Sequence, residues 1–242
     1  MRMRLKKWAA PELREAAFVV DAPELCRGRW RGQFARPDQP LYLELGCGKG
    51  GFISQLAFAH PEQNFLAIDK IDNMLGLAKR AVERVYAQRP GGPDNVRLAS
   101  FEAECIDRML APEDRVERLY INFCNPWPRP RHRKHRLTYT SQLLRYRSFL
   151  APGAEFYFKT DDDGLFRDTL NHYLPEAGFL VEEVIGDLHA AQLPENIETE
   201  HERMFSAEGI PIKFLRARVG ELPVSSLAEA EASAGGIPEI HA

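Results

Sequence analysis

The chain has 242 residues and the composition of an ordinary globular protein, with 44% hydrophobic and 28% charged residues. This length suffices for one large domain with a substantial core, and no apolar run reaches the roughly 18 residues that a membrane span requires. The formal net charge of -3 argues against an overall affinity for nucleic acid, although the charges are segregated along the chain. The four cysteines lie far apart, without a His at metal-ligand spacing, so we expect no metal site, no disulfides and a cytoplasmic location.

Three regions differ in composition. Residues 1–36 are basic and lack sustained periodicity, and we expect an N-terminal arm there. Its Trp8 and Trp30 either staple it to the domain or face nucleic acid. Residues 37–220 contain the expected regular elements and form the main domain. Residues 221–242 contain acids but no Lys or Arg, and we expect an acidic, flexible tail.

The expected elements alternate between strands and helices. The strands are predicted at 41–45, 63–69, 96–99, 118–123, 155–160, 180–185 and 212–218, and the helices at 51–59, 71–88, 104–109, 138–150 and 166–174. In the helix 71–88, Met74, Ala78, Val82 and Val85 recur at helical spacing, with Lys79 on the opposite face. This order predicts an α/β fold with a doubly wound, mostly parallel, seven-stranded sheet of the Rossmann-like type.

A glycine-rich turn follows the first strand. Gly46, Gly48 and Gly50 stand where the chain turns into the first helix, and glycine lets the backbone approach a ligand that a Cβ would exclude. Asp69 ends the next strand, where an acid would hold ribose hydroxyls. The spacing alone fits either NAD or S-adenosylmethionine. Glu44, just before the glycines, favours the second, because a carboxylate suits the ammonium of a methionine moiety and repels a pyrophosphate.

A second motif follows the fourth strand. Asn125-Pro126-Trp127-Pro128 must leave the sheet because proline lacks the ladder donor, so the Asn125 amide is placed at the carboxyl end of a central strand. Amino-methyltransferases have an Asn/Asp-Pro-Pro-aromatic turn at this place. The cationic loop that follows contains Arg129, Arg131, His132, Arg133, Lys134, His135 and Arg136. It suggests a contact with polyanions, or else a solvated run of charges.

Two further groups lie later in the chain. Phe158-Lys159-Thr160-Asp161 ends the fifth strand with an acid on the same edge of the sheet. Thr199 and Glu202 are three residues apart and would share one face of a helical turn, either as part of a site or as a capping box.

Together these motifs resemble the bacterial tRNA (guanine-N(7)-)-methyltransferase family, from residue 1 to about residue 218. The resemblance implies a class I methyltransferase fold and transfer of a methyl group from S-adenosylmethionine to nitrogen-7 of the guanine at position 46 in the variable loop of tRNA. It implies cofactor contacts from Glu44, Gly46, Gly48, Gly50, Asp69, Glu102 and Asn125. It implies catalytic roles for Asn125, Asp161 and Glu202, with Asp161, Thr199 and Glu202 in the guanine pocket. The phosphates would be held by the basic loop, through Arg129, Arg131, His132, Arg133, Lys134 and Arg136.

The chain departs from the family pattern at two positions near this loop. The family usually has Asp in place of Asn125 and Arg in place of His135. Two alternatives therefore stay open: an amino-methyltransferase acting on adenine or glutamine, and a tRNA-binding paralogue with weakened turnover. The sequence sets no oligomeric state, so monomer and homodimer are both compatible with it.

The expected chemistry needs no general base. Nitrogen-7 of guanine carries a free lone pair, so the protein has to align that lone pair with the methyl group, an effect that can supply roughly 7–11 kcal/mol. Asp161 and Glu202 are expected to accept hydrogen bonds from the Watson–Crick edge of guanine, which would reject bases that lack those donors.

Overall fold

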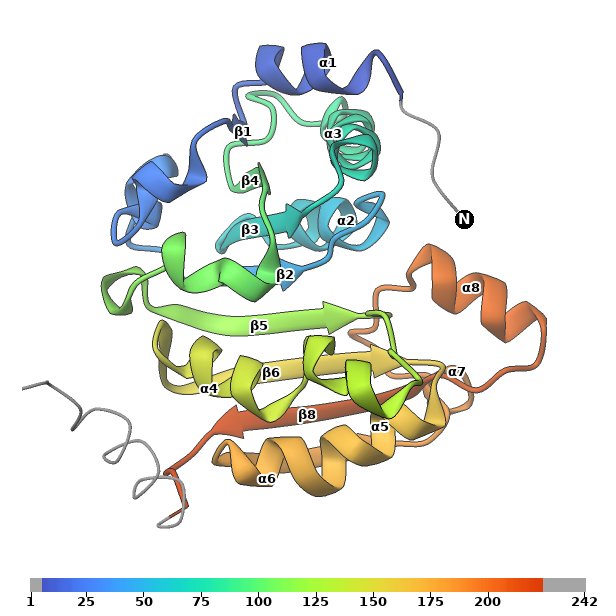
Figure 1. Ribbon diagram of the computed structural model, residues 1–242. Coiled ribbons are helices and arrows are strands. Elements are labelled where there is room, and N and C mark those ends of the chain that lie inside the picture. The colour runs from blue at the N-terminus through green and yellow to red at the C-terminus, as the bar shows by residue number, and fades with distance from the viewer. Residues whose placement is uncertain (1–5, 224–242) are drawn as a thin grey trace, which may run out of the picture.

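The computed structural model describes residues 6–223. Within them, one eight-stranded sheet has the order β1-β4-β3-β2-β5-β6-β8-β7 (Figure 1). The strands are β1 (Val19–Val20), β2 (Leu41–Leu45), β3 (Asn64–Asp69), β4 (Val96–Ser100), β5 (Val116–Asn122), β6 (Leu150–Thr160), β7 (Phe179–Ile185) and β8 (Lys213–Val219). Only β8 runs antiparallel to its neighbours β6 and β7. The doubly wound, mostly parallel sheet is confirmed, with one more strand than expected.

The additional strand is β1, which pairs with β4 through Val19 and Val20. Two residues are too few to show an alternating pattern, so the sequence carried no signal for it. The first five residues of the expected arm, and all but 221–223 of the expected acidic tail, lie outside the described residues.

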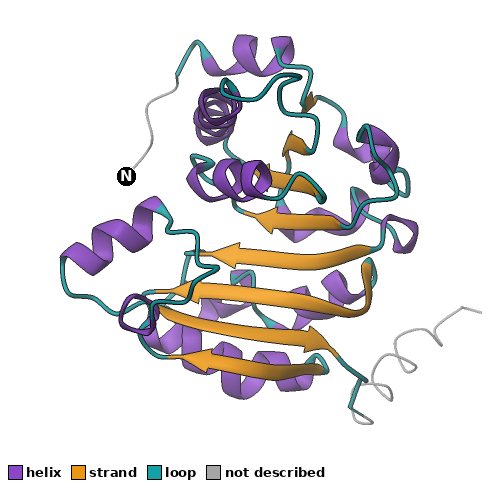
Figure 2. Ribbon diagram, turned by 180° about the vertical axis from the view of Figure 1, so that it is seen from behind, coloured by secondary structure: helices purple, strands orange, loops and turns teal. Residues whose placement is uncertain are grey.

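Helices cover the sheet in two layers. They are α1 (Ala9–Glu15), α2 (Gly51–Ala59), α3 (Asp72–Tyr86), α4 (Thr140–Arg147), α5 (Asp163–Asp168), α6 (Leu174–Glu176), α7 (Leu188–Ala191) and α8 (Glu200–Ala207), with a π turn, η6 (Thr169–Tyr173), between α5 and α6. Short 3-10 turns are η1 (Pro23–Cys26), η2 (Trp30–Gln33), η3 (Ala103–Arg108), η4 (Pro112–Asp114) and η5 (Pro130–His135). Seen from behind, the C-terminal half of the sheet lies in front of α4–α6 (Figure 2). Each face of the sheet has its own apolar core.

Helix α3 buries Ala78 and Val82 as expected, but it also buries the side that includes Lys79, which was expected to face solvent. Leu75, Val82 and Tyr86 are buried, whereas Met74 and Val85 are only half-buried. The reason is α1, which packs on α3 and covers the side that includes Lys79. The Lys79 ammonium pairs with Glu83 at 2.8 Å and with Glu12 of α1 at 3.6 Å.

The part of the expected arm that is described, residues 6–36, packs into the domain. Trp30 is fully buried, and its indole N–H donates to the Met109 carbonyl at 2.9 Å. Asp114 accepts from the backbone N–H groups of Gly28 and Trp30, each at 2.9 Å. Trp30 therefore staples this segment to the domain. Near the start, Trp8 stacks under the Arg80 guanidinium at 3.5 Å.

Candidate active site

The glycine-rich turn sits between β2 and α2. Gly46, Gly48 and Gly50 all have φ between 54 and 75°, a region that residues with a Cβ rarely adopt. A Cβ on Gly50 would also lie 2.6 Å from the Cα of Ala78, so only glycine lets the turn pass this close to α3. The Gly48 N–H donates to Asp69 at 3.0 Å, which joins the turn to the end of β3.

Glu44 lies beneath this turn and is only 2% exposed. Its Oε1 accepts from the Asn122 amide at 3.0 Å, while its Oε2 has no hydrogen-bond partner within residues 6–223. Burial raises the pKa of Glu44 from its ordinary 4.5 to about 7. A buried carboxylate with one free oxygen is a site for a cationic group, since such a ligand would supply the missing partner.

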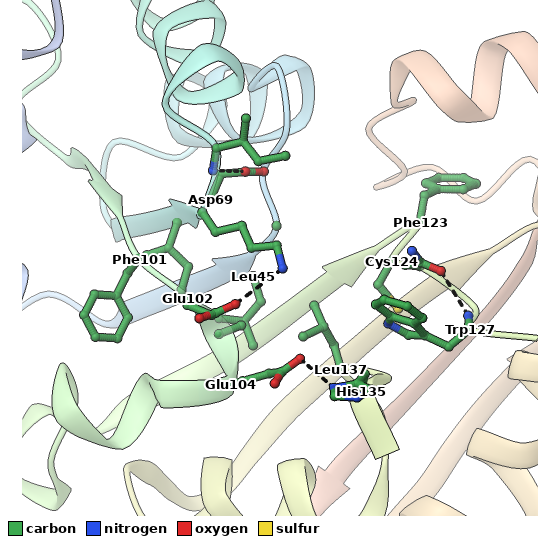
Figure 3. Close-up of a pocket in the computed structure, with 16 residues that line it drawn as sticks. Leu45, Asp69, Phe101, Glu102, Glu104, Phe123, Cys124, Trp127, His135 and Leu137 are labelled. Carbon is green, nitrogen blue, oxygen red and sulfur yellow. Dashed lines mark hydrogen bonds and ion pairs between the residues drawn. The ribbon is translucent and has the colours of Figure 1, made fainter. Parts of the chain in front are cut away.

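Two cavities meet at this edge of the sheet. The glycine-turn cavity, of about 220 Å³, is lined by Glu44, Gly48, Asn122, Thr199 and His201 among others. The larger cavity, of about 250 Å³, is lined by Glu102, Glu104, Asn125, Trp127 and His135 among others (Figure 3). Three residues line both cavities, namely Gly46, Asp69 and Phe123. The two cavities thus adjoin, and a ligand with a polar cationic end and a larger aromatic end would fit across them.

Acidic side chains line the larger cavity. Asp69 is partly buried, accepts from the Ile71 N–H at 2.9 Å, and has its pKa raised by burial. Glu102 is exposed and lies 3.4 Å from the Lys70 ammonium. Glu104 faces His135 across the lower part of the cavity at 3.2 Å (Figure 3). Asp69 and Glu102 are therefore placed where carboxylates can bind the hydroxyls of a ribose.

The Asn-Pro-Trp-Pro turn forms the opposite wall of the larger cavity. Asn125 is exposed, and its side-chain oxygen accepts from the Trp127 N–H at 3.0 Å, which closes the turn on itself (Figure 3). Trp127 has φ 42° and packs against His135, with ring centroids 5.4 Å apart. The turn is thus braced from within, and the Asn125 amide lies on the wall of the cavity.

The basic loop is mostly exposed. Arg129, Arg131 and Lys134 are exposed and have no carboxylate partner within the described residues, and Arg133 lies 3.6 Å from Asp168. His132 is half-buried against Trp127, with ring centroids 5.7 Å apart. The exposed cations form a surface that would attract phosphate.

Arg136 differs from the rest of the loop, because it is only 3% exposed. Its guanidinium donates to Asp168 at 2.6 Å, to the Pro126 carbonyl at 2.7 Å and to the Tyr173 hydroxyl at 3.1 Å. The expected phosphate contact does not fit this burial. Arg136 instead ties the Asn-Pro-Trp-Pro turn to the helical segment below it.

Thr199 and Glu202 form the capping box that the sequence offered as one alternative. The Thr199 hydroxyl accepts from the Glu202 N–H at 3.0 Å, and the Glu202 carboxylate reaches back to the Thr199 N–H, which makes a capping box at the start of α8. Glu202 is 2% exposed, and its oxygens also bind the Lys159 ammonium at 3.1 Å and the Asn196 amide at 2.5 Å. With both oxygens occupied, Glu202 does not fit the expected role as an acceptor for guanine.

Asp161 lines neither of the two cavities. It is partly buried at the end of β6, and its backbone carbonyl accepts from the Lys213 ammonium at 2.8 Å. Its carboxylate has no hydrogen bond or ion pair within residues 6–223. The structure thus brings Glu44, Asp69, Glu102 and Asn125 around the cavities, and leaves Asp161 as a free carboxylate on the same edge of the sheet.

Sequence reasoning missed three residues of the site. Asn122 holds Glu44, Phe123 joins the two cavities, and Lys159 neutralises Glu202. A polar residue directly after the apolar run 119–121 was a signal for Asn122. Lys159 is buried, which lowers the pKa of its ammonium, while Glu202 and Glu44 act in the opposite sense. Its pairing depends on a residue 43 positions away, which no local pattern reveals.

The fold and this site define a class I, S-adenosylmethionine-dependent methyltransferase. Glu44 lines the glycine-turn cavity, Glu102 lines the larger cavity and Asp69 lines both. Two solved structures show the same fold. One is an antibiotic-related methyltransferase, with a TM-score of 0.55 and 17% sequence identity, which covers 91% of this chain and 97% of its own. The other is the 16S rRNA (adenine(1408)-N(1))-methyltransferase of Catenulisporales acidiphilia, with a TM-score of 0.54 and 16% identity, which covers 83% of this chain and 92% of its own.

The family follows from sequence relatives. A family model described as "Putative methyltransferase" matches residues 38–215. The tRNA (guanine-N(7)-)-methyltransferase of Ruminiclostridium cellulolyticum is 51% identical over 219 residues, which are 90% of this chain and 92% of that protein. The protein of the same name from Clostridium beijerinckii is 49% identical over 217 residues, or 90% and 98%. The chain belongs to the tRNA (guanine-N(7)-)-methyltransferase family.

No group of three His, Cys, Asp or Glu side chains within residues 6–223 is arranged to hold a metal ion. In the same part of the chain, no helix is long and apolar enough to cross a membrane.

Proposed function

We propose that the protein transfers a methyl group from S-adenosylmethionine to nitrogen-7 of the guanine at position 46 in the variable loop of tRNA, in the cytoplasm. The observation that carries this proposal is the shared wall between the cofactor cavity and the basic loop. The turn 125–128 lines the larger cavity and leads directly into the exposed cations of η5. A tRNA held by these cations would have its backbone next to the place where the methyl group is presented.

The methyl transfer requires no proton transfer to or from the protein. The N7 lone pair forms the new bond to the methyl carbon, the carbon–sulfur bond breaks with its electron pair staying on sulfur, and no proton moves. The positive charge therefore passes from the sulfonium to the purine. The residues of this chain bind and orient: Glu44 and Asn122 fix the methionine end, while Asp69 and Glu102 fix the ribose.

Recognition of guanine falls to Asp161 rather than to Glu202 in this proposal. A guanine base presents N–H donors on its Watson–Crick edge, and Asp161 has a carboxylate that is free to accept them. The target base has to be turned out of the folded tRNA to reach this edge of the sheet. Glu202 and Thr199 contribute indirectly, because they fix the start of α8 beside the glycine-turn cavity.

Asn125 is compatible with this chemistry. Its oxygen already closes the turn with the Trp127 N–H, a role that an amide performs as well as a carboxylate. Because no general base is required, the absence of a charge at this position removes no proton acceptor from the reaction. An amide here would still hold the base or the cofactor by hydrogen bonds.

The test is incubation of the purified protein with labelled S-adenosylmethionine and unmodified tRNA, followed by mapping of the methylated nucleoside. We expect 7-methylguanosine at position 46. Label in methyladenosine or in a protein glutamine would instead indicate the amino-methyltransferase. Binding of tRNA without methyl transfer would indicate the paralogue, and recovery of transfer in Asn125→Asp would then identify Asn125 as the cause.

A further inference from the structure

Phe123 has an unusual backbone conformation at the end of the central strand. Its φ is 53°, in the left-handed region that bulky residues avoid, and its N–H donates to the Lys159 carbonyl at 2.9 Å. Such strain persists only where the surroundings hold it, and it is concentrated at functional sites. The effect here is to turn the ring away from the direction of β5.

The ring of Phe123 belongs to an aromatic cluster with α8. It stacks on His201 with centroids 5.6 Å apart and planes 20° apart, and on Phe205 at 6.2 Å and 30° (Figure 3 shows Phe123 below α8). His201 is exposed on the first turn of α8. That turn is held from both sides, by the buried pair of Lys159 and Glu202 and by Lys49, which lies 2.8 Å from Glu200.

The position of this cluster ties it to the reacting atoms. Phe123 is one of three residues that line both cavities, and His201 lines the glycine-turn cavity. The other two shared residues are Gly46, which offers only backbone, and Asp69, which binds the glycine turn. At the junction of the two cavities, an aromatic face thus comes from Phe123 and its stacking partner.

We propose that Phe123 and His201 form a stacking platform for the guanine base that receives the methyl group. This inference rests on the proposed function and assigns the place of the base within it. Stacking on aromatic rings accepts any base, so the platform supplies affinity and alignment, while hydrogen bonds to the base edge supply the selectivity. The platform also matches the change of charge, because the purine becomes a cation on methylation and a π face attracts a cation.

The test compares variants that remove a ring with variants that keep one. Phe123→Leu and His201→Leu remove the ring, Phe123→Tyr and His201→Tyr keep it, and Met204→Ala removes an exposed apolar side chain of α8 that has no part in the cluster. We expect the leucine variants to lower kcat/KM for tRNA roughly five- to hundredfold. Met204→Ala should stay within about threefold of wild type, and the tyrosine variants should keep most of the activity that the leucine variants lose. Because Phe123 and His201 also line the cofactor cavities, the dissociation constant for S-adenosylmethionine is measured by calorimetry in all five variants, and kcat/KM for tRNA is compared at saturating cofactor.

A second readout needs no cofactor. Binding of unmodified tRNA and of the same tRNA carrying 7-methylguanosine is compared in slightly acidic buffer, so that the methylated base keeps its positive charge. Wild type should prefer the methylated tRNA roughly two- to thirtyfold, and the leucine variants should lose that preference. Since His201 is exposed, its leucine variant is expected to fold even if the strained Phe123 position tolerates no change.

The outcomes separate the platform from the proposed function. A wild-type protein that does not methylate tRNA overturns the proposed function, and the affinity ratio still decides on the platform. If the wild-type protein binds methylated and unmodified tRNA equally well, the platform is overturned, whether or not the protein methylates tRNA. The platform is also overturned if the leucine variants keep the wild-type kcat/KM for tRNA. It is likewise overturned if these variants lose affinity for the cofactor but still prefer methylated tRNA.

Discussion

We expect the buried Glu44 to lower the stability of the protein above neutral pH while it serves the proposed cofactor site, and Glu44→Gln tests both expectations. The carboxylate is 2% exposed and has one oxygen without a partner within the described residues. A glutamine keeps the shape and can still accept from Asn122, but it carries no charge to bury. We expect the variant to be more stable than wild type above neutral pH and to bind S-adenosylmethionine much more weakly.

The magnitude follows from the pKa of Glu44, which burial raises from 4.5 to about 7. Below about pH 4.5 the carboxyl is protonated in both the folded and unfolded states, so it contributes nothing to the pH dependence. Between about pH 4.5 and pH 7 the carboxyl loses its proton only in the unfolded state, so the free energy of unfolding falls as pH rises. Each unit corresponds to about 1.36 kcal/mol, which gives a loss of about 3 kcal/mol that is complete above pH 7.

Urea denaturation at a series of pH values tests this reasoning. The free energy of unfolding of Glu44→Gln should match that of wild type near about pH 4.5 and exceed it by about 3 kcal/mol at about pH 8, which for a domain of this size is roughly 6–12 °C in Tm. The exposed Glu15 offers a control, since Glu15→Gln should show no such pH-dependent gain. A difference between Glu44→Gln and wild type that does not change with pH would refute the argument.

Cofactor affinity should follow the same titration. The ammonium of the methionine moiety pairs with the ionised carboxylate, so wild-type affinity for S-adenosylmethionine should rise with pH up to about 7, by at most tenfold per unit. Glu44→Gln should show weak binding without that rise. A wild-type affinity that is constant between about pH 5 and 7 would place the ammonium elsewhere.

Three further changes test the buried ion pairs and the basic loop. Lys159→Met should lower the free energy of unfolding by about 3–5 kcal/mol in urea, because Glu202 would be left buried and unpaired, and adding Glu202→Gln should recover part of the loss. Arg131→Ala should reduce the slope of tRNA affinity against salt by about one while stability is unchanged. Arg136→Ala should leave the salt dependence of tRNA affinity near that of wild type. It should lower the free energy of unfolding by about 3 kcal/mol, because Asp168 loses its partner.

The fold was predictable because its signals are local. The apolar runs that became β2, β3 and β5 and the glycine turn after β2 are readable from neighbouring residues alone. The expected helix 138–150 was too long, since α4 ends at Arg147 and the Pro152-Gly153 pair lies within β6. The predictions that failed concern features that depend on packing between residues far apart in the sequence. Lys79 reads as a solvent-facing residue of α3 until α1 is known to cover it.

In the candidate site, too, residues with a local sequence signal were predictable and those that depend on distant partners were not. Glu44 and Asp69 line the cavities, and their positions could be predicted because each stands at a strand end beside a turn that only glycine can make, while their cofactor contacts stay a prediction. The burial of Arg136 and Glu202 was not predicted, because a charged residue in a loop or a first helical turn gives no sign of burial. Whether it meets solvent depends on Asp168 and Lys159, which lie 32 and 43 positions away. A charge run alone therefore does not separate residues that bind a ligand from those that hold the loop.

The buried cations Arg136 and Lys159 connect the segments that form the proposed tRNA and cofactor surfaces. Arg136 binds the carbonyl of Pro126, so the basic loop and the wall of the larger cavity are parts of one braced unit. Lys159 joins the sheet to α8 through Glu202, and α8 supports the ring of His201 against Phe123. A tRNA that shifts the loop would thus move the wall of the cofactor cavity as well. If the proposed site is correct, we expect these two ion pairs, rather than a charge at position 125, to set how well the two substrates are aligned.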